Sequence, residues 1–335
     1  MEISFAWIVF IIILALAFDF MNGFHDAANS IATIVSTRVL RPHQAVAWAA
    51  FFNFIAFLFF GLHVANTIGK DVIDPAIIDP WVILSALSGA IIWNVVTWYF
   101  GIPSSSSHAL IGGLAGAGVA KAGVHVLRGT GFMKISVSIL ASPLFGFTLA
   151  FIFMTVVSLL FFRSTPRKVD RYGRRLQLVS ASLYSLGHGG NDAQKTMGII
   201  AILLYSTGHL GKEFHVPLWV VLACHVAMGV GTLFGGWRIV KTMGMKITKL
   251  KPIGGFCAET AGAFTLFLAT HLGIPVSTTH TITGSIVGVG AVTKLSSVRW
   301  GVAGRIVWAW ILTIPCSAFI SAATWGLVHW LTTRS

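Results

Sequence analysis

Two short stretches of the sequence carry the same polar residues in the same order. GIPSSSSHALIGG begins at Gly101 and GIPVSTTHTITGS begins at Gly273. Each has Gly-x-Pro, then a run of hydroxyl side chains, then a histidine. Proline suits the first turn of a helix, because its missing N–H would have no partner there. We therefore expect a half-helix to begin at each motif, with free backbone N–H groups and the positive end of a helix dipole.

Such helix starts attract anions, and the hydroxyl groups add further donors at the same place. Two of them converging could surround a tetrahedral oxyanion with uncharged donors. Hydroxyls in membrane helices often bond only the carbonyl four residues earlier, but the duplication of the motif favours ligand binding. The predicted oxyanion-binding residues are Ser104, Ser105, Ser106, Ser107, Ser277, Thr278 and Thr279.

A second pair of motifs contains carboxylates. NGFHDAANSIATIV begins at Asn22 and HGGNDAQKTMGII begins at His188, so that Asp26 aligns with Asp192. A carboxylate deep in hydrocarbon costs about 2.5–3.5 kcal/mol and usually marks an ion or proton path. The sequence predicts a site for a small cation or proton made of Asp26, Asn29, Asp192, Asn22, Asn191 and Gln194, with supporting roles for His25, His108, His280, Lys195 and Glu259.

Two further acids, Asp19 and Glu259, have no acidic counterpart in the other motif. Their roles stay open, and Asp19 fits a solvated place near the membrane face equally well. Three cysteines without metal-ligand spacing are expected to be core residues. The sequence therefore predicts no metal site, disulfide or cofactor besides a coupling cation, H⁺ or Na⁺.

Composition places these motifs in a membrane. Hydrophobic residues make up 56% of the 335 positions and charged residues only 10%. Apolar runs of membrane-spanning length recur along the chain. We expect an all-α polytopic membrane protein with about ten segments, near residues 4–37, 45–62, 81–100, 107–119, 135–162, 176–205, 217–240, 252–272, 279–292 and 306–331.

The motifs also divide the chain into two halves. Residues 1–162 are predicted to form one repeat with a linking span, 163–177 a basic cytoplasmic loop, and 178–335 the second repeat. Charge placement makes the repeats inverted, with broken helices at Asn22-Gly23, at Gly187 to Gly190 and at the two GIP motifs. Inverted repeats with broken helices are typical of transporters that bind their substrate near the bilayer midplane.

The net charge of +13 reports orientation rather than nucleic-acid binding, because the basic residues lie between apolar runs. The segment RSTPRKVDRYGRR, residues 163–175, is the densest basic stretch and is expected in the cytoplasm. Both termini then face outward from a multi-pass protein of the cell inner (plasma) membrane. The sequence leaves open a homo-oligomer and a soluble cytoplasmic regulator docking at this segment.

Together these motifs resemble the inorganic phosphate transporter (Pit) family of secondary carriers. HDAANS at His25, NDAQKT at Asn191 and the two GIP motifs carry the resemblance over nearly the whole chain. It implies symport of phosphate with a cation, the hydroxyl loops holding phosphate and the Asp motifs holding the coupling ion. Some members carry phosphate as a neutral complex with a divalent metal, and the sequence leaves that form open.

One departure from the resemblance concerns coupling. Lys195 stands opposite Asn29 in the repeat alignment, where sodium-coupled members tend to have a neutral amide. We therefore expect proton coupling, with Lys195 neutralising Asp192 and with Asp26 or a histidine carrying the proton.

Two other functions fit some of the same residues. A permease for sulfate or another oxyanion would use the same hydroxyl loops. An intramembrane hydrolase would use Asp26, His108 and serines, but it needs one asymmetric catalytic set, whereas these motifs occur twice. An enzyme is therefore not expected.

Overall fold

The computed structural model describes residues 4–70, 72–73, 77–211 and 213–334, and this part of the chain contains helices and no β-strand. The all-α architecture predicted from the sequence is confirmed. The α-helices are α1 (Phe5–Ser36), α2 (Pro42–Ile55), α3 (His63–Lys70), α4 (Pro80–Phe100), α5 (Ser106–Ala122), α6 (Gly129–Leu160), α7 (Pro166–Ser206), α8 (Leu218–Phe234), α9 (Trp237–Lys241), α10 (Pro252–His271), α11 (Thr278–Thr293) and α12 (Trp300–Arg334).

Each of the ten predicted segments coincides with one of the longer helices. Among the described residues, five helices are long and apolar enough to cross a membrane, namely α1, α4, α6, α10 and α12. Two bent pairs, α2 with α3 and α8 with the segment 237–246, bring the number to at most seven. The helices α5 and α11 are too short for this test, as expected of half-helices, and the total of about ten membrane segments stays a prediction.

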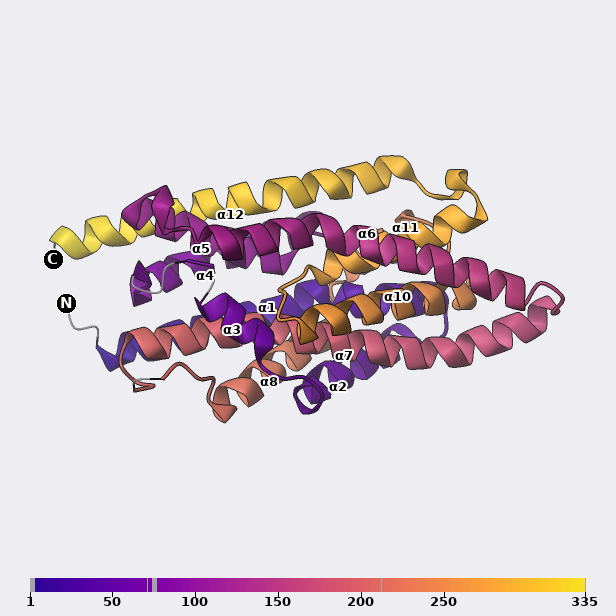
Figure 1. Ribbon diagram of the computed structural model, residues 1–335, viewed down its shortest axis with the longest axis horizontal. Coiled ribbons are helices and arrows are strands. Elements are labelled where there is room, and N and C mark those ends of the chain that lie inside the picture. The colour runs from indigo at the N-terminus through magenta and orange to yellow at the C-terminus, as the bar shows by residue number, and fades with distance from the viewer. Residues whose placement is uncertain (1–3, 71, 74–76, 212, 335) are drawn as a thin grey trace.

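The long helices lie roughly parallel to one axis (Figure 1). Helix α1 begins at the end of the bundle where α12 ends, and the turn between α6 and α7 lies at the opposite end. Helices α1 and α7 therefore run in opposite directions, and they pack against each other. In addition, α5 packs against α12 while α11 packs against α6. Each half-helix thus contacts the last long helix of the other half of the chain.

The apolar core has two parts, and the polar motifs lie between them. Along α1, residues 8–18 contribute to one cluster and residues 28–34 to the other. The stretch between them holds Asp19, Asn22, His25 and Asp26, which are all buried. The fold thus encloses these polar side chains between two apolar layers, well away from both ends of the bundle.

The predicted breaks in the Asp-containing helices are wrong. Helix α1 continues through Gly23 and α7 continues through residues 187–190. A Cβ atom on Gly23 would overlap the backbone carbonyl of Met228, and one on Gly189 would overlap the backbone of Asn53. These glycines therefore allow neighbouring helices to approach closely, which is a common use of small residues in membrane bundles.

The predicted basic loop at 163–177 is also corrected. Helix α7 begins at Pro166, so that most of this segment forms its first three turns. Proline is favourable at the helix start, and arginine and lysine are good helix formers. The basic side chains therefore project from a helix that extends beyond the apolar bundle.

Candidate functional site

Both GIP motifs form a turn followed by a helix start, but each proline lies two residues before the N-cap and not in the first helical turn that the sequence predicts. Helix α4 ends at Phe100, Gly101 adopts a left-handed φ of 65°, and α5 begins at Ser106. In the second copy Gly273 has a φ of 67° and α11 begins at Thr278. A positive φ favours glycine, which explains the first residue of each motif.

A serine caps each of these half-helices. The Ser105 hydroxyl accepts from the backbone N–H of His108 at 3.3 Å, and the Ser277 hydroxyl accepts from that of His280 at 3.2 Å. This N-cap geometry satisfies one free N–H and leaves each hydroxyl hydrogen available to a ligand. The two capping serines are thus structural as well as candidate ligand residues.

The two half-helix starts meet inside the bundle. The ring centroids of His108 and His280 are 4.5 Å apart, and the two rings are arranged edge to face. The Lys195 ammonium donates to the Ser107 hydroxyl at 2.5 Å and to the Val276 carbonyl at 2.8 Å, so that it bridges the two motifs. The convergence expected from the sequence is therefore present, and the Lys195 ammonium contacts both motifs.

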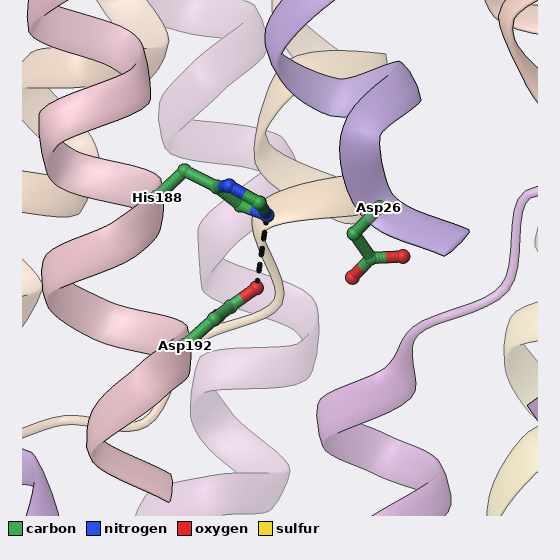
Figure 2. A group of neighbouring side chains, drawn as sticks. All are labelled: Asp26, His188 and Asp192. Atoms are coloured by element: carbon green, nitrogen blue, oxygen red, sulfur yellow. Dashed lines mark ion pairs between the residues drawn. The ribbon is translucent and has the colours of Figure 1, made fainter. Parts of the chain in front are cut away.

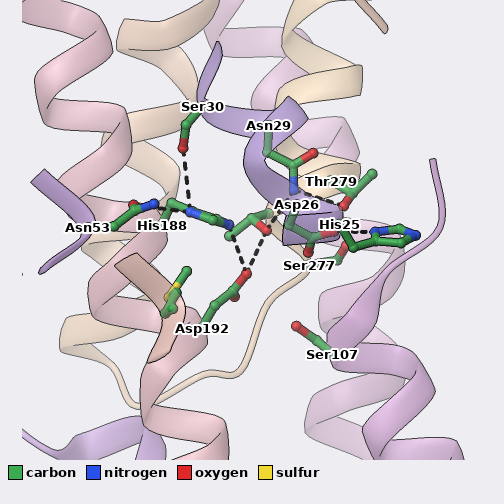
Figure 3. Close-up of polar contacts among 12 residues, drawn as sticks. His25, Asp26, Asn29, Ser30, Asn53, Ser107, His188, Asp192, Ser277 and Thr279 are labelled. Atoms are coloured by element: carbon green, nitrogen blue, oxygen red, sulfur yellow. Dashed lines mark hydrogen bonds and ion pairs between the residues drawn. The ribbon is translucent and has the colours of Figure 1, made fainter. Parts of the chain in front are cut away.

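Asp192 is the most heavily partnered carboxylate at this place. Its side chain accepts from the Lys195 ammonium at 2.5 Å and from the Thr278 hydroxyl at 2.9 Å. The His188 Nε2 atom lies 3.3 Å from Asp192 Oδ2, the oxygen that also accepts from Thr278 (Figures 2 and 3). All of these side chains are buried. A buried carboxylate needs such compensation, and here the lysine supplies the opposite charge.

Asp26 approaches from α1 and belongs to the same cluster. Its carboxylate lies 2.7 Å from the His25 Nδ1 atom, whose ring also reaches the Thr97 hydroxyl at 3.0 Å. Asn29, one turn further, donates to the Thr278 and Thr279 hydroxyls at 3.2 and 2.9 Å (Figure 3). Helix α1 is thereby tied to the start of α11.

Asp26, His188 and Asp192 each offer one ligand atom, and these atoms lie within 4.8 Å of one another (Figure 2). Carboxylate oxygens and an imidazole nitrogen can together surround a small cation or share a proton. The sequence did not assign His188 to the site. One sequence signal could have identified His188 as a site residue. It stands opposite Asn22 in the repeat alignment and one helical turn before Asp192.

Some predicted residues have other partners. Gln194 accepts from the backbone N–H groups of Val64 and Ala65 at the start of α3, at 3.0 and 3.3 Å. Asn191 donates to the Thr270 hydroxyl at 2.9 Å and thus supports the second GIP turn. Ser104 donates to the Thr97 hydroxyl at 2.9 Å and lies beside His25. These three residues position the surrounding backbone.

Glu259 forms a separate buried cluster. It accepts from the Thr33 hydroxyl at 2.6 Å, the Gln177 amide at 2.9 Å and the Ser180 hydroxyl at 2.5 Å. The cluster joins α10 to α1 and α7. None of its three partners had been singled out from the sequence, because they come from distant segments that only the fold brings together.

Some buried polar atoms near the site lack a hydrogen-bond partner. They include the Ser106 hydroxyl, the Asn22 side-chain oxygen and both ring nitrogens of His108. Unpartnered buried polar groups are uncommon, and at a binding site they mark positions that a ligand can satisfy. The Ser106 hydroxyl, in the first turn of α5, is the clearest of these free donors.

This is a helical membrane protein that holds two half-helix starts and two buried aspartates around one polar centre. The model of the phosphate transporter family matches residues 22–321, which include all of the site residues described above. A "Probable low-affinity inorganic phosphate transporter" of Rhizobium meliloti (strain 1021) is 67% identical over 96% of each chain. One of Bacillus subtilis (strain 168), with the same name, is 47% identical over 98% of this chain and 99% of the other.

The solved structure described as "The sodium-dependent phosphate transporter" matches the fold with a TM-score of 0.89 and 27% identity, covering 97% of this chain and 99% of that one. The chain belongs to the phosphate transporter family. The family resemblance inferred from the motifs is therefore confirmed, and the protein is a transporter rather than an enzyme.

Proposed function

We propose that the protein takes up inorganic phosphate by symport with protons. The observation that carries this proposal is the position of Lys195. Its ammonium occupies a place among three oxygen atoms, one each from Asp192, Ser107 and Val276, at 2.5 to 2.8 Å. Oxygen ligands of this kind would otherwise suit a bound metal cation. A fixed ammonium in this place removes the need for one transported cation.

Phosphate is held by uncharged donors in this proposal. The free amides and hydroxyls at the starts of α5 and α11 face the anion from two sides, and helix dipoles strengthen the attraction. The hydroxyls with a hydrogen free for phosphate are those of residues 105–107, Ser277 and Thr279, because Ser104 and Thr278 donate to Thr97 and Asp192. Uncharged donors give selectivity for a tetrahedral anion while still allowing its release, which a carrier requires.

The comparison within the chain supports the role of Lys195. Asn29 occupies the matching position on α1, where its amide contacts Thr278 and Thr279. One half of the site thus has a neutral amide and the other an ammonium. The structural neighbour is named as sodium-dependent. The built-in charge next to Asp192 favours the proton for this chain.

The basic start of α7 supports an orientation for this transport. We place residues 163–175 in the cytoplasm and both chain ends outside a bacterial-type inner membrane, following the positive-inside rule. Helix α1 begins and α12 ends at the bundle end opposite the α6–α7 turn, as this orientation requires (Figure 1). Association into a homo-oligomer or with a soluble regulator stays a prediction of the sequence.

The test is labelled phosphate uptake into proteoliposomes with pH, sodium and magnesium gradients imposed one at a time. Proton symport predicts accumulation driven by an inward proton gradient in sodium-free buffer. Accumulation that needs sodium and ignores the pH gradient would contradict it. A strict requirement for magnesium would instead indicate that a metal–phosphate complex is carried, and competition by sulfate would indicate a broader oxyanion permease.

A further inference from the structure

Asp19 is an acidic residue that has no role in the phosphate site described above. It lies on α1 and is 0% exposed, so the solvated place near the membrane face that the sequence allowed is wrong. Neither carboxyl oxygen forms a hydrogen bond of regular geometry with a described residue. The polar side chains next to it are those of Asn22, Thr196 and Cys224.

The other two buried acids of α1 and α7 differ from Asp19 in this respect. Asp26 has His25 beside it, and Asp192 has a lysine, a hydroxyl and a histidine. An ionised carboxylate that is fully buried with no cation beside it is very unfavourable, even where a hydroxyl, an amide and a thiol lie next to it, and such a group takes up a proton instead. Asp19 therefore occupies an environment suited to a neutral carboxylic acid.

The ionisable groups that face Asp19 increase this preference. They are Asp192 on α7, which is negative, and the Cys224 thiol on α8. Helix α4, which also packs against α1, contains Tyr99 as its one ionisable side chain, and that ring is exposed. Glu259 on α10 contacts Thr33, fourteen residues further along α1. No cation among the described residues pairs with Asp19, and its nearest charge repels a carboxylate.

Asp19 is also aligned with the transport site. Asp19, Asn22 and Asp26 share one face of α1, at i, i+3 and i+7, and Asp192 and Thr196 share one face of α7, at i and i+4. Among the described residues, neither the Asn22 side-chain oxygen nor the Thr196 hydroxyl forms a hydrogen bond of regular geometry. Buried polar side chains on α1 and α7 therefore lie in a row from Asp19 to Asp26 and Asp192.

We propose that Asp19 is the proton-binding residue of this symporter. The proposal rests on the proposed proton symport and names the group that carries the proton. The Asp19 carboxylate takes a proton from a hydronium ion on the side where α1 begins, which leaves water and forms a carboxylic acid. After the site opens to the other side, the O–H bond breaks and the proton passes to water there, which regenerates the carboxylate.

Coupling follows from charge. Seven residues of helix separate Asp19 from Asp26, a rise of about 10 Å. For an anion held next to the Asp26 cluster, at a distance of that order and an effective dielectric constant of about 20, the Asp19 carboxylate weakens binding roughly 10- to 20-fold for each negative charge on the anion. Protonation of Asp19 removes that repulsion. Phosphate and proton therefore bind together, although Asp19 does not contact phosphate.

The sequence had favoured Asp26 or a histidine as the carrier. His108 lies close to Lys195, so that a proton there would add a second cation beside the ammonium. Asp26 already has an imidazole partner at 2.7 Å. Of the acids in this region, Asp19 changes charge without breaking an ion pair.

The experiment compares the full-length wild type with Asp19→Asn and Asp19→Glu in proteoliposomes. Asp19→Asn mimics the protonated acid, so we expect phosphate exchange at equal concentrations to stay within about twofold of wild type, following the charge argument above. Accumulation driven by a pH gradient is expected to be lost. Asp19→Glu keeps an acid and is expected to keep accumulation.

Proton uptake on phosphate binding, measured with a pH indicator in weakly buffered detergent solution, gives a second readout. Wild type should take up more protons per phosphate than Asp19→Asn. Equal uptake, or gradient-driven accumulation by Asp19→Asn, would overturn the proposal while proton symport stands. Loss of exchange by Asp19→Asn would also overturn it, because a residue that only carries the proton is not needed for exchange. If wild type itself ignores the pH gradient, proton symport fails instead.

Discussion

Replacing Lys195 by asparagine tests whether the lysine takes the place of a transported cation. The substitution places a neutral amide three residues after Asp192, just as Asn29 follows Asp26 by three residues on α1. It removes an ammonium that contacts Asp192 at 2.5 Å, Ser107 at 2.5 Å and the Val276 carbonyl at 2.8 Å. In sodium-free solution Asp192 is then a buried carboxylate without its counter-charge.

The magnitude follows from the loss of that charge. Breaking a buried ion pair by removing one partner costs about 3–5 kcal/mol. That cost falls on the stability of the folded protein, and the loss of positive charge beside the hydroxyl motifs lowers the affinity for phosphate as well. Sodium entering the vacated oxygen cage would recover much of that affinity. We therefore expect Lys195→Asn to bind and transport phosphate poorly in choline buffer and to be stimulated by sodium.

The assay is phosphate binding to purified protein, together with uptake into proteoliposomes, each in choline and in sodium buffer. Lys121→Asn is a matched control, because Lys121 pairs with Asp79 at 2.6 Å but both side chains are partly exposed. A pair of that kind contributes at most about 1 kcal/mol. Unchanged affinity of Lys195→Asn without sodium would refute the role of Lys195 in neutralising Asp192. If Lys195→Asn binds phosphate weakly and sodium does not restore the affinity, the idea that the ammonium replaces a cation is refuted.

Three further substitutions test other parts of the site. Asp192→Asn should abolish coupled phosphate uptake while membrane insertion, measured by quantitative blotting, stays normal; normal accumulation would remove Asp192 from the mechanism. Ser106→Ala should weaken phosphate binding about 10- to 150-fold, the worth of a hydrogen bond to a charged group, without lowering the melting temperature. Ser142→Ala, which removes another unpartnered buried hydroxyl, is its control, and equal effects of the two would argue against a ligand role for Ser106. Gly23→Ala should destabilise the protein by about 1–3 kcal/mol, because its Cβ would overlap the Met228 carbonyl. Gly301→Ala, with nothing within 4 Å, should leave the thermal unfolding in detergent unchanged, and no difference between the two glycine variants would contradict the close packing of α1 and α8.

The sequence predicted the half-helix starts well because local chemistry determines them. Proline restricts its own φ, glycine permits the 65° and 67° turns, and serine caps the helix that follows. The glycines in the Asp-containing helices led to a wrong prediction. Their local preference suggested breaks, but close packing against Met228 and Asn53 keeps α1 and α7 continuous. Helix–helix packing depends on the whole fold and is not visible in one segment.

The candidate site was predicted in part for the same reason. Asp26, Asp192 and the hydroxyl runs could be recognised because each occurs twice in the chain. Gln194 carries a side chain that suits an ion ligand, yet it caps the start of α3, which only the bend after α2 brings close. Asp19 shows the converse case. Its sequence position near the first apolar run gave no indication of the contacts from α7 and α8 that exclude it from solvent.

The residues that differ between the two halves of the chain suggest how coupling arises. The hydroxyl motifs match each other and suit an anion that must be reached from both sides of the membrane. The ionisable groups do not match: Lys195 stands opposite Asn29, Asp19 opposite Ser185 and Glu259 opposite Leu87. Two matching donor loops bind phosphate equally well whichever side of the membrane the site opens to. By themselves they support only the exchange of phosphate across the membrane, without accumulation. A second ion must bind at groups whose charge changes the affinity for phosphate, and a single copy of such a group is sufficient for that. The unmatched acids and the unmatched lysine are therefore where the energetics of symport are expected to reside, and substitutions there should separate accumulation from exchange while substitutions in the hydroxyl motifs should reduce both.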